Sequence, residues 1–182
     1  YPLRRQRQMC IRDRYAVFGA ILGLYEIALS KGEIGMTKGE IAKNNFMQGY
    51  NCAQAVLLAF CDDLGFDEQT ALMLASPFGG GIGRMREVCG AFTGAVMVLG
   101  LKFGNTIGND RAAKGKDYER VQLFAKRFKE ELGSDTIICR ELLGLSGPSD
   151  PDPAKRTKEY YQKRPCPETV AIASGLLGEF ME

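Results

Sequence analysis

The chain has 182 residues, of which 45% are hydrophobic and 25% charged, a composition typical of a globular protein with its own core. It contains no histidine, which excludes Ser-His-Asp and Cys-His catalytic pairs as well as histidine-ligated zinc or haem. With 24 basic and 22 acidic residues, the formal charge of +2 is too small to favour binding to nucleic acid.

The first part of the chain lacks the pattern of a folded element. Residues 4–14 (RRQRQMCIRDR) are basic, have no apolar period and back-translate to a sequencing-adaptor oligonucleotide. Residues 15–29 are apolar but too short to span a bilayer, and residues 31–36 can be encoded by a purine-rich ribosome-binding site and a start codon. We therefore expect residues 1–35 to be a non-native extension, the alternative being a basic tail that binds anions. Residues 36–182 would then be the native domain, and its formal charge would be −1 because six basic and three acidic residues precede it.

From residue 36 onward, the spacing of apolar residues predicts helices separated by capping residues and glycines. The helix at 52–64 is apolar nearly all round, so we expect it to lie at the centre of the domain. Small residues recur four apart in the helix at 88–102, which lets another helix approach closely. The full set, in chain order, is 38–47, 52–64 capped by Asn51, 68–75 capped by Asp67, 88–102, 118–132 capped by Asp117, 154–162, and a last helix from Pro165 to about Phe180.

Two stretches between these helices differ in kind. A glycine-rich loop, GGGIG at 79–83, precedes the helix at 88–102. Residues 136–143 are ambiguous, because TII at 136–138 favours an extended chain and RELL at 140–143 favours a helix start. No internal repeat occurs, and no strand alternation is longer than a few residues. The predicted fold class is therefore all-α, a compact single-domain helical bundle with a glycine-rich loop.

Cysteine is the unusual part of the composition, with six residues. Four of them lie at or near the start of an expected helix: Cys52, Cys89, Cys139 and Cys166. Unpaired N–H groups and the helix dipole favour a thiolate there, so we expect a lowered pKa and raised reactivity. A single cysteine is more often a small buried hydrophobe, but a shared position for four is harder to explain by packing. Cys61 lies on the opposite face of its helix from Cys52, and we expect it to be buried.

Five segments of the chain carry a resemblance to a known family: GYNCAQAV at 49–56, FGGGIGRM at 78–85, CGAFTG at 89–94, CREL at 139–142 and a last cysteine. Together they resemble the C-GCAxxG-C-C family, small prokaryotic proteins described as redox-active. The resemblance covers nearly all of residues 36–182. It implies that Cys52, Cys89, Cys139 and Cys166 are the family's four signature cysteines, with Cys10 and Cys61 outside the pattern.

Three kinds of chemistry fit four thiols without histidine. The first, which we rank slightly ahead, is an iron–sulfur cluster or another soft metal that the four thiolates bind for electron transfer. The second is thiol–disulfide exchange, in which the same four cysteines are redox thiols that work in pairs. The third is a non-catalytic helical binding module with a structural zinc ion held by the four cysteines. No C-x-x-C pair occurs, so the spacing alone does not show whether the four meet in space.

The glycine-rich loop is expected to support this site. Its glycines would let the backbone approach Cys89 closely, and Arg84 or Arg86 would stabilise the Cys89 thiolate. A phosphate site in the loop is the alternative, but no strand precedes the loop and the Walker lysine is missing. The expected supporting residues are Gly79, Gly80, Gly81, Gly83, Arg84 and Gly90.

The sequence leaves three properties open: the identity of the redox partner, the oligomeric state and whether the protein is an enzyme. We expect no nucleic-acid partner and no membrane span within residues 36–182. We also expect a cytoplasmic location, where thiols stay reduced.

Overall fold

The computed structural model describes residues 35–181. Within this range the chain is helical, with no strand and one isolated β-bridge between Val88 and Ile138, so the predicted all-α class is confirmed. Met36–Glu182 forms one compact unit. None of the described helices combines the length and the apolar character that a bilayer span requires. Residues 1–34 lie outside the described residues, so the interpretation of residues 1–35 as a non-native extension stays a prediction.

Side-chain caps set the starts of several helices. Thr37 and Glu40 form a capping box at the first described helix, and Asn51 and Gln54 form another at the next. Asp67 caps the helix predicted at 68–75. The elements in chain order are α2 (Lys38–Met47), α3 (Cys52–Leu58), α4 (Cys61–Leu64), α5 (Glu68–Ala75), the 3-10 turn η1 (Ser76–Phe78), α6 (Gly90–Phe103), α7 (Arg111–Leu132), α8 (Cys139–Leu142), α9 (Lys158–Gln162) and α10 (Cys166–Met181).

The core forms around α3 and α10. Helix α10 packs against α2, α3, α6 and α7, and α3 packs against α2, α5 and α6. Burying each large apolar side chain contributes about 1.5–3 kcal/mol, which offsets part of the entropy lost on ordering the helices. The central position predicted for the helix that begins at residue 52 is confirmed for α3. The largest fully buried side chains include Phe46, Phe60, Phe124, Phe128, Leu57 and Leu177.

Helices α3 and α6 touch through small residues. A Cβ atom added to Gly94 would lie 2.7 Å from the carbonyl oxygen of Ala53. One added to Gly90 would lie 3.0 Å from the Cβ atom of Cys52. The close approach predicted from the small residues is therefore confirmed, and it holds the start of α3 against the start of α6.

The helix predicted at 52–64 is wrong only in its continuity: the chain leaves the helix after Leu58 and becomes helical again in α4 from Cys61. The carbonyl of Ala59 accepts a hydrogen bond from Lys38 Nζ at 2.9 Å. The same ammonium group lies 5.2 Å from the centroid of the Phe60 ring. Lys38 lies in α2, which is distant in the sequence, and its side chain thus satisfies the carbonyl of Ala59 at the break between α3 and α4.

The start predicted at Asp117 is also wrong. Helix α7 begins at Arg111, and Asp110 caps it by accepting the N–H of Ala113 at 2.8 Å. Asp117 lies inside the helix, where its carboxylate accepts the backbone N–H of Asn105 at 2.9 Å. The carboxylate therefore ties α7 to the segment after α6 instead of starting a helix.

Two further helix starts differ from the expected ones, and the ambiguous segment shows both of its tendencies. The helix predicted at 88–102 is α6, which begins two residues later because Val88 pairs with Ile138. The ambiguous segment 136–143 combines both tendencies, since the bridge at Ile138 is followed at once by α8. The helix predicted at 154–162 is limited to α9, because Thr157 caps it by accepting the N–H of Tyr160.

Gly94→Ala tests the contact between α3 and α6. The new Cβ would press on backbone atoms of Ala53, which cannot rotate away, so we expect the free energy of unfolding to fall by ~1–3 kcal/mol. Gly100→Ala is the matched control in the same helix, because no described atom lies within 4 Å of its new Cβ. The control should gain up to about 1 kcal/mol from helix propensity. Urea unfolding followed by circular dichroism measures both variants, and equal stabilities would contradict the contact.

Candidate functional site

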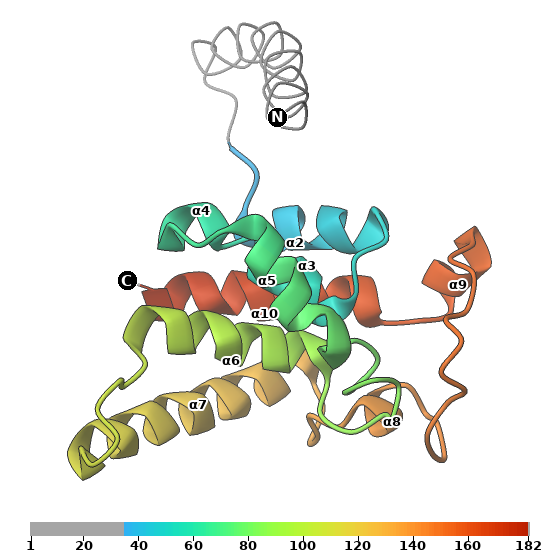
Figure 1. Ribbon diagram of the computed structural model, residues 1–182. Coiled ribbons are helices and arrows are strands. Elements are labelled where there is room, and N and C mark those ends of the chain that lie inside the picture. Colours follow the sequence, from blue (N-terminus) through green and yellow to red (C-terminus); the bar gives the residue numbers. More distant parts are fainter. Residues whose placement is uncertain (1–34, 182) are drawn as a thin grey trace, which may run out of the picture. The chain divides into compact units, whose positions relative to one another are not determined.

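The four signature cysteines all start helices, as predicted. Cys52 is the first residue of α3 and Cys89 is the N-cap of α6. Cys139 and Cys166 are the first residues of α8 and α10. Figure 1 shows that α6 and α10 begin at the same end of the bundle, next to α8 and α9. Cysteines far apart in the sequence therefore come to one end of the domain.

One cavity of about 290 Å³ joins these cysteines, because all four contribute to its wall. Cys52 and Cys166 are partly exposed, whereas Cys89 and Cys139 are buried. As whole residues, Cys52 and Cys166 therefore keep more exposed surface than the other two signature cysteines, although burial still raises the pKa of the Cys52 thiol. The residues predicted to support the site also line the cavity: Gly79, Gly80, Gly81, Gly83, Arg84 and Gly90.

Cys61 is separate from this group, in agreement with its predicted burial. Its side chain is 1% exposed within the core, and its thiol donates a hydrogen bond to the carbonyl of Leu57. Burial raises the pKa of Cys61 to about 11, with smaller contributions from nearby acidic groups. A neutral thiol packed in this way behaves as a small hydrophobe.

The glycine-rich loop lies directly against two of the helix starts. A Cβ atom on Gly81 would be 2.6 Å from the Cβ of Cys139, and one on Gly79 would be 2.8 Å from the side chain of Asn51. The closest approaches are therefore to Cys139 and Asn51, not to Cys89 as predicted. The loop also holds the β-branched Ile82 at a φ of 57°, a conformation that costs energy and occurs most often at functional sites.

Two arginines in and after the loop have partners that differ from the predicted one. Arg86 is 3% exposed, and its Nη1 lies 3.8 Å from the sulfur of Cys139. Arg84 donates from Nε to the backbone carbonyl of Asp150. The structure gives these arginines other partners than the predicted Cys89: Arg86 reaches Cys139 and Arg84 reaches the carbonyl of Asp150, both from residues with a left-handed backbone.

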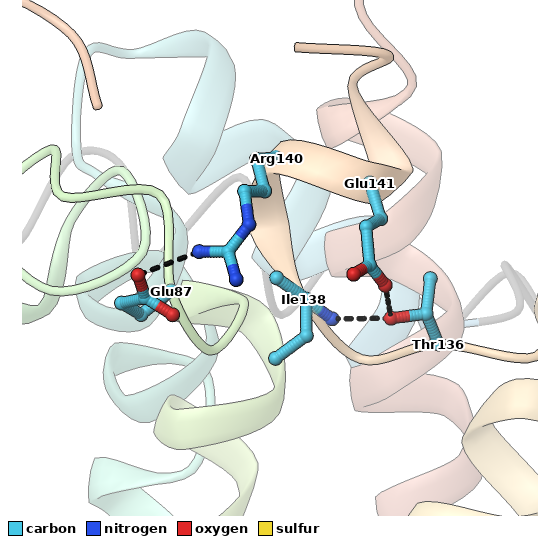
Figure 2. A network of polar contacts seen from close by, with 5 residues as sticks. All are labelled: Glu87, Thr136, Ile138, Arg140 and Glu141. Carbon is cyan, nitrogen blue, oxygen red and sulfur yellow. Dashed lines mark hydrogen bonds and ion pairs between the residues drawn. The ribbon is translucent and has the colours of Figure 1, made fainter. Parts of the chain in front are cut away.

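A polar network holds Cys139 in place. Arg140 pairs with Glu87 at 2.5 Å, and the N–H of Ile138 donates to Thr136 Oγ1 at 3.0 Å; Figure 2 shows both contacts. The hydroxyl of Thr136 donates in turn to Glu141. The N–H of Cys139 donates to the carbonyl of Glu87 at 2.6 Å. The start of α8 is thus tied to the segment that links the glycine-rich loop to α6.

Cys166 is the one signature cysteine whose pKa falls as expected. The Cys52 thiol hydrogen-bonds to its sulfur and lowers the pKa of Cys166 to about 7, although burial acts in the opposite direction. The positive charges of Arg164 and Arg86 and a backbone N–H group also favour the thiolate. The thiol of Cys52 and the nearby arginine charges therefore favour the ionised form of Cys166.

For the other three cysteines, the expected lowering of the pKa is wrong. The hydrogen bond to Cys166 and burial raise the pKa of Cys52 well above its usual value. Burial raises the pKa of Cys89 to about 12, even though the N–H groups of Ala91 and Phe92 favour its thiolate. Burial also raises the pKa of Cys139, against the opposing effect of Arg86. A helix start lowers a thiol pKa only where desolvation does not outweigh it.

The predicted metal site can be judged by the type of its ligands and by their positions. Four thiols facing one cavity are the ligand type that iron–sulfur clusters and soft metals require. Within residues 35–181, however, no three cysteine, aspartate or glutamate side chains are grouped closely enough to hold a metal ion. The chemistry of the ligands suits a soft metal or a cluster, whereas their positions in the described residues do not form a site for a single metal ion.

Sequence reasoning missed three residues of the cavity wall: Arg156, Tyr160 and Arg164. The guanidinium of Arg164 lies 4.8 Å from the centroid of the Tyr160 ring. Arg156 donates to the backbone carbonyl of Phe46 at 2.8 Å, and its guanidinium group lies 4.5 Å from the centroid of the Phe46 ring. The closeness of Arg164 to Cys166 in the chain was a usable signal, whereas nothing local pointed to Arg156.

A family model described as "Putative redox-active protein (C_GCAxxG_C_C)" matches residues 50–180. The chain belongs to this family. The resemblance seen in the sequence is thereby confirmed, and the matched range contains Cys52, Cys89, Cys139 and Cys166. Membership of the C_GCAxxG_C_C family supports redox activity in general. No curated protein and no solved structure matched the chain.

The pKa of Cys166 can be tested by alkylation with iodoacetamide, monitored by peptide mass spectrometry over a range of pH. The alkylation rate of Cys166 should reach half of its maximum near pH 7. Cys52→Ala removes the hydrogen bond that stabilises the thiolate, so the midpoint should move to higher pH. Cys61 serves as the internal control and should stay unreactive at neutral pH. An unchanged midpoint in the Cys52→Ala variant would contradict the interaction.

Proposed function

We propose that this member of the C_GCAxxG_C_C family carries out thiol–disulfide exchange, with Cys166 as the attacking thiolate and Cys52 as the resolving thiol. The proposal is carried by the place of these two cysteines together in the wall of the cavity, where each has the largest effect on the pKa of the other. Both are partly exposed, unlike the other two signature cysteines. A thiol with a pKa near the ambient pH is also the optimum attacking group.

The reaction balances as an exchange of two electrons. The Cys166 sulfur attacks one sulfur of an external disulfide, so a mixed disulfide forms, the external S–S bond breaks and the first thiolate leaves with the electron pair. Cys52 then loses its proton to solvent, and its sulfur attacks the Cys166 sulfur and releases the second thiol. The external disulfide is reduced to two thiols, and the protein ends with a Cys52–Cys166 disulfide. An external dithiol reductant is needed to restore the starting state.

Cys89 and Cys139 do not start the reaction in this proposal. Burial disfavours both thiolates, and a neutral thiol is a poor nucleophile. Their place in the cavity wall allows them to act as a second, slower pair once the first pair is oxidised. We propose the cytoplasm as the compartment, because a reducing environment returns such pairs to the dithiol state.

Metal binding is the second candidate function. It is favoured by the presence of four signature sulfurs in the wall of one cavity. The same cysteines would supply the ligands: Cys52, Cys89, Cys139 and Cys166. No step of the proposed reaction depends on a metal, because the exchange needs only the thiol pair and an external disulfide.

Trapping of the mixed disulfide tests the assigned roles. The Cys52→Ala variant keeps the attacking sulfur, with a higher pKa than in the wild type, but cannot resolve the product, so at a pH above that pKa it should accumulate a mixed disulfide at Cys166. The Cys166→Ala variant should form at least about tenfold less adduct, because the remaining thiols are neutral at pH 7. Intact-mass spectrometry after exposure to 2-hydroxyethyl disulfide measures both variants, and Cys61→Ala is the control with wild-type behaviour. Adduct formed mainly at Cys52, Cys89 or Cys139 would overturn the roles.

Metal analysis of protein purified without oxygen distinguishes the two candidates. Iron, acid-labile sulfide and zinc should each fall well below one equivalent per chain, while exchange with 2-hydroxyethyl disulfide remains. Two or four irons with matching sulfide, lost together on Cys89→Ser, would support a cluster instead. One zinc per chain that blocks alkylation of all four signature cysteines would support the structural zinc site.

A further inference from the structure

The cavity wall is strongly positive. Among the residues that the structure describes, four arginines contribute to the wall and no aspartate or glutamate does: Arg84, Arg86, Arg156 and Arg164. Within residues 35–181, the ion pairs involve none of these four side chains. The charges of the cavity are therefore not balanced by carboxylates of this part of the chain.

Each arginine is held by neutral groups instead. Arg86 donates from Nε to the hydroxyl of Ser149 at 2.8 Å and is almost fully buried. Arg156 and Arg164 lie over the Tyr160 ring, at 5.8 Å and 4.8 Å from its centroid. Backbone carbonyls, a hydroxyl and aromatic rings orient a guanidinium group without neutralising it.

The loop that contains Asp150 and Asp152 does not balance the positive charge of the cavity wall. Asp150 contributes only its backbone carbonyl to Arg84, and its carboxylate accepts the N–H of Asp152 at 2.8 Å within the same turn. The Cys166 thiolate supplies one negative charge while the protein is reduced, and it loses that charge when the disulfide forms. Partly buried cations without a counter-charge are costly, so an anion that enters the cavity is stabilised in both redox states.

Building on the proposed thiol–disulfide exchange, we infer that the cavity binds a small disulfide that carries carboxylate or phosphate groups. Guanidinium groups recognise both groups through paired hydrogen bonds. The apolar part of the wall, which includes Pro151, Pro153 and Leu143, accommodates the carbon skeleton. The volume of about 290 Å³ suits a small molecule. The arginines also stabilise the negative charge on the sulfur that leaves.

Three aliphatic disulfides of similar size test this assignment in the full chain: 3,3′-dithiodipropionate, 2-hydroxyethyl disulfide and cystamine, which are dianionic, neutral and dicationic. The rate of adduct formation at Cys166 in the Cys52→Ala variant should be highest for the dianion and lowest for the dication. The dianion should exceed the neutral disulfide by roughly tenfold, as expected for a charge-assisted contact. Added salt should reduce the differences in rate among the three disulfides, because it screens the charges.

Arg156→Gln, added to that background, separates substrate recognition from activation of the thiol. Arg156 lines the cavity but is not among the groups that lower the pKa of Cys166. We expect the variant to lose most of the preference for the dianion, because the rate with the dianion should fall more than the rate with the neutral disulfide. Arg120→Gln is the matched control, because Arg120 also lies over a ring, that of Phe103, and is outside the cavity wall.

The outcomes separate the two proposals. Rates independent of probe charge, with efficient adduct formation at Cys166, would overturn the anionic substrate and leave thiol–disulfide exchange standing. A preference for the dianion that survives Arg156→Gln together with Arg164→Gln would also overturn it. Absence of any adduct at Cys166 in a folded protein, checked by circular dichroism, would overturn both.

Discussion

The contact between Cys52 and Cys166 joins the first residues of α3 and α10, the two helices around which the core forms. A neutral thiol and two guanidinium groups surround the Cys166 sulfur, and these favour its negative charge although burial opposes it. The contact depends on helix packing elsewhere. Small residues at positions 90 and 94 bring α6 against α3, and α10 lies against α2, α3, α6 and α7. The position of two sulfurs thus depends on how several helices meet.

The four cysteines differ because their surroundings differ. Each starts a helix, and the local electrostatic effect of that position has the same sign for all four. Buried Cys89 and Cys139 lose more from desolvation than they gain, while Cys166 gains from a thiol donor and from Arg164. A more acidic thiol beside a neutral one is the difference that gives a thiol–disulfide exchange a defined direction of attack.

Local sequence signals predicted a large part of the fold and the cysteine set. The Asn51 cap and the proline after Cys166 indicated helix starts correctly. Contacts between distant segments could not be predicted, and these account for the break after Leu58, where Lys38 takes the Ala59 carbonyl. The pKa values of the cysteines and the position of the Arg86 side chain could not be predicted either, since burial and the left-handed backbone at Arg86 arise only in the folded chain. The convergence of the four thiols on one cavity also depends on tertiary structure, because no C-x-x-C pair brings two of them together locally.

The central claim is that Cys52 and Cys166 form the functional pair. Mapping the first disulfide that appears during titration with a mild oxidant, by digestion and tandem mass spectrometry without reduction, tests it most directly. The account predicts a peptide pair that links Cys52 to Cys166 before any other linkage appears, with Cys61 still a free thiol. A first disulfide between Cys89 and Cys139, or four signature thiols that all stay free throughout the titration, would contradict it.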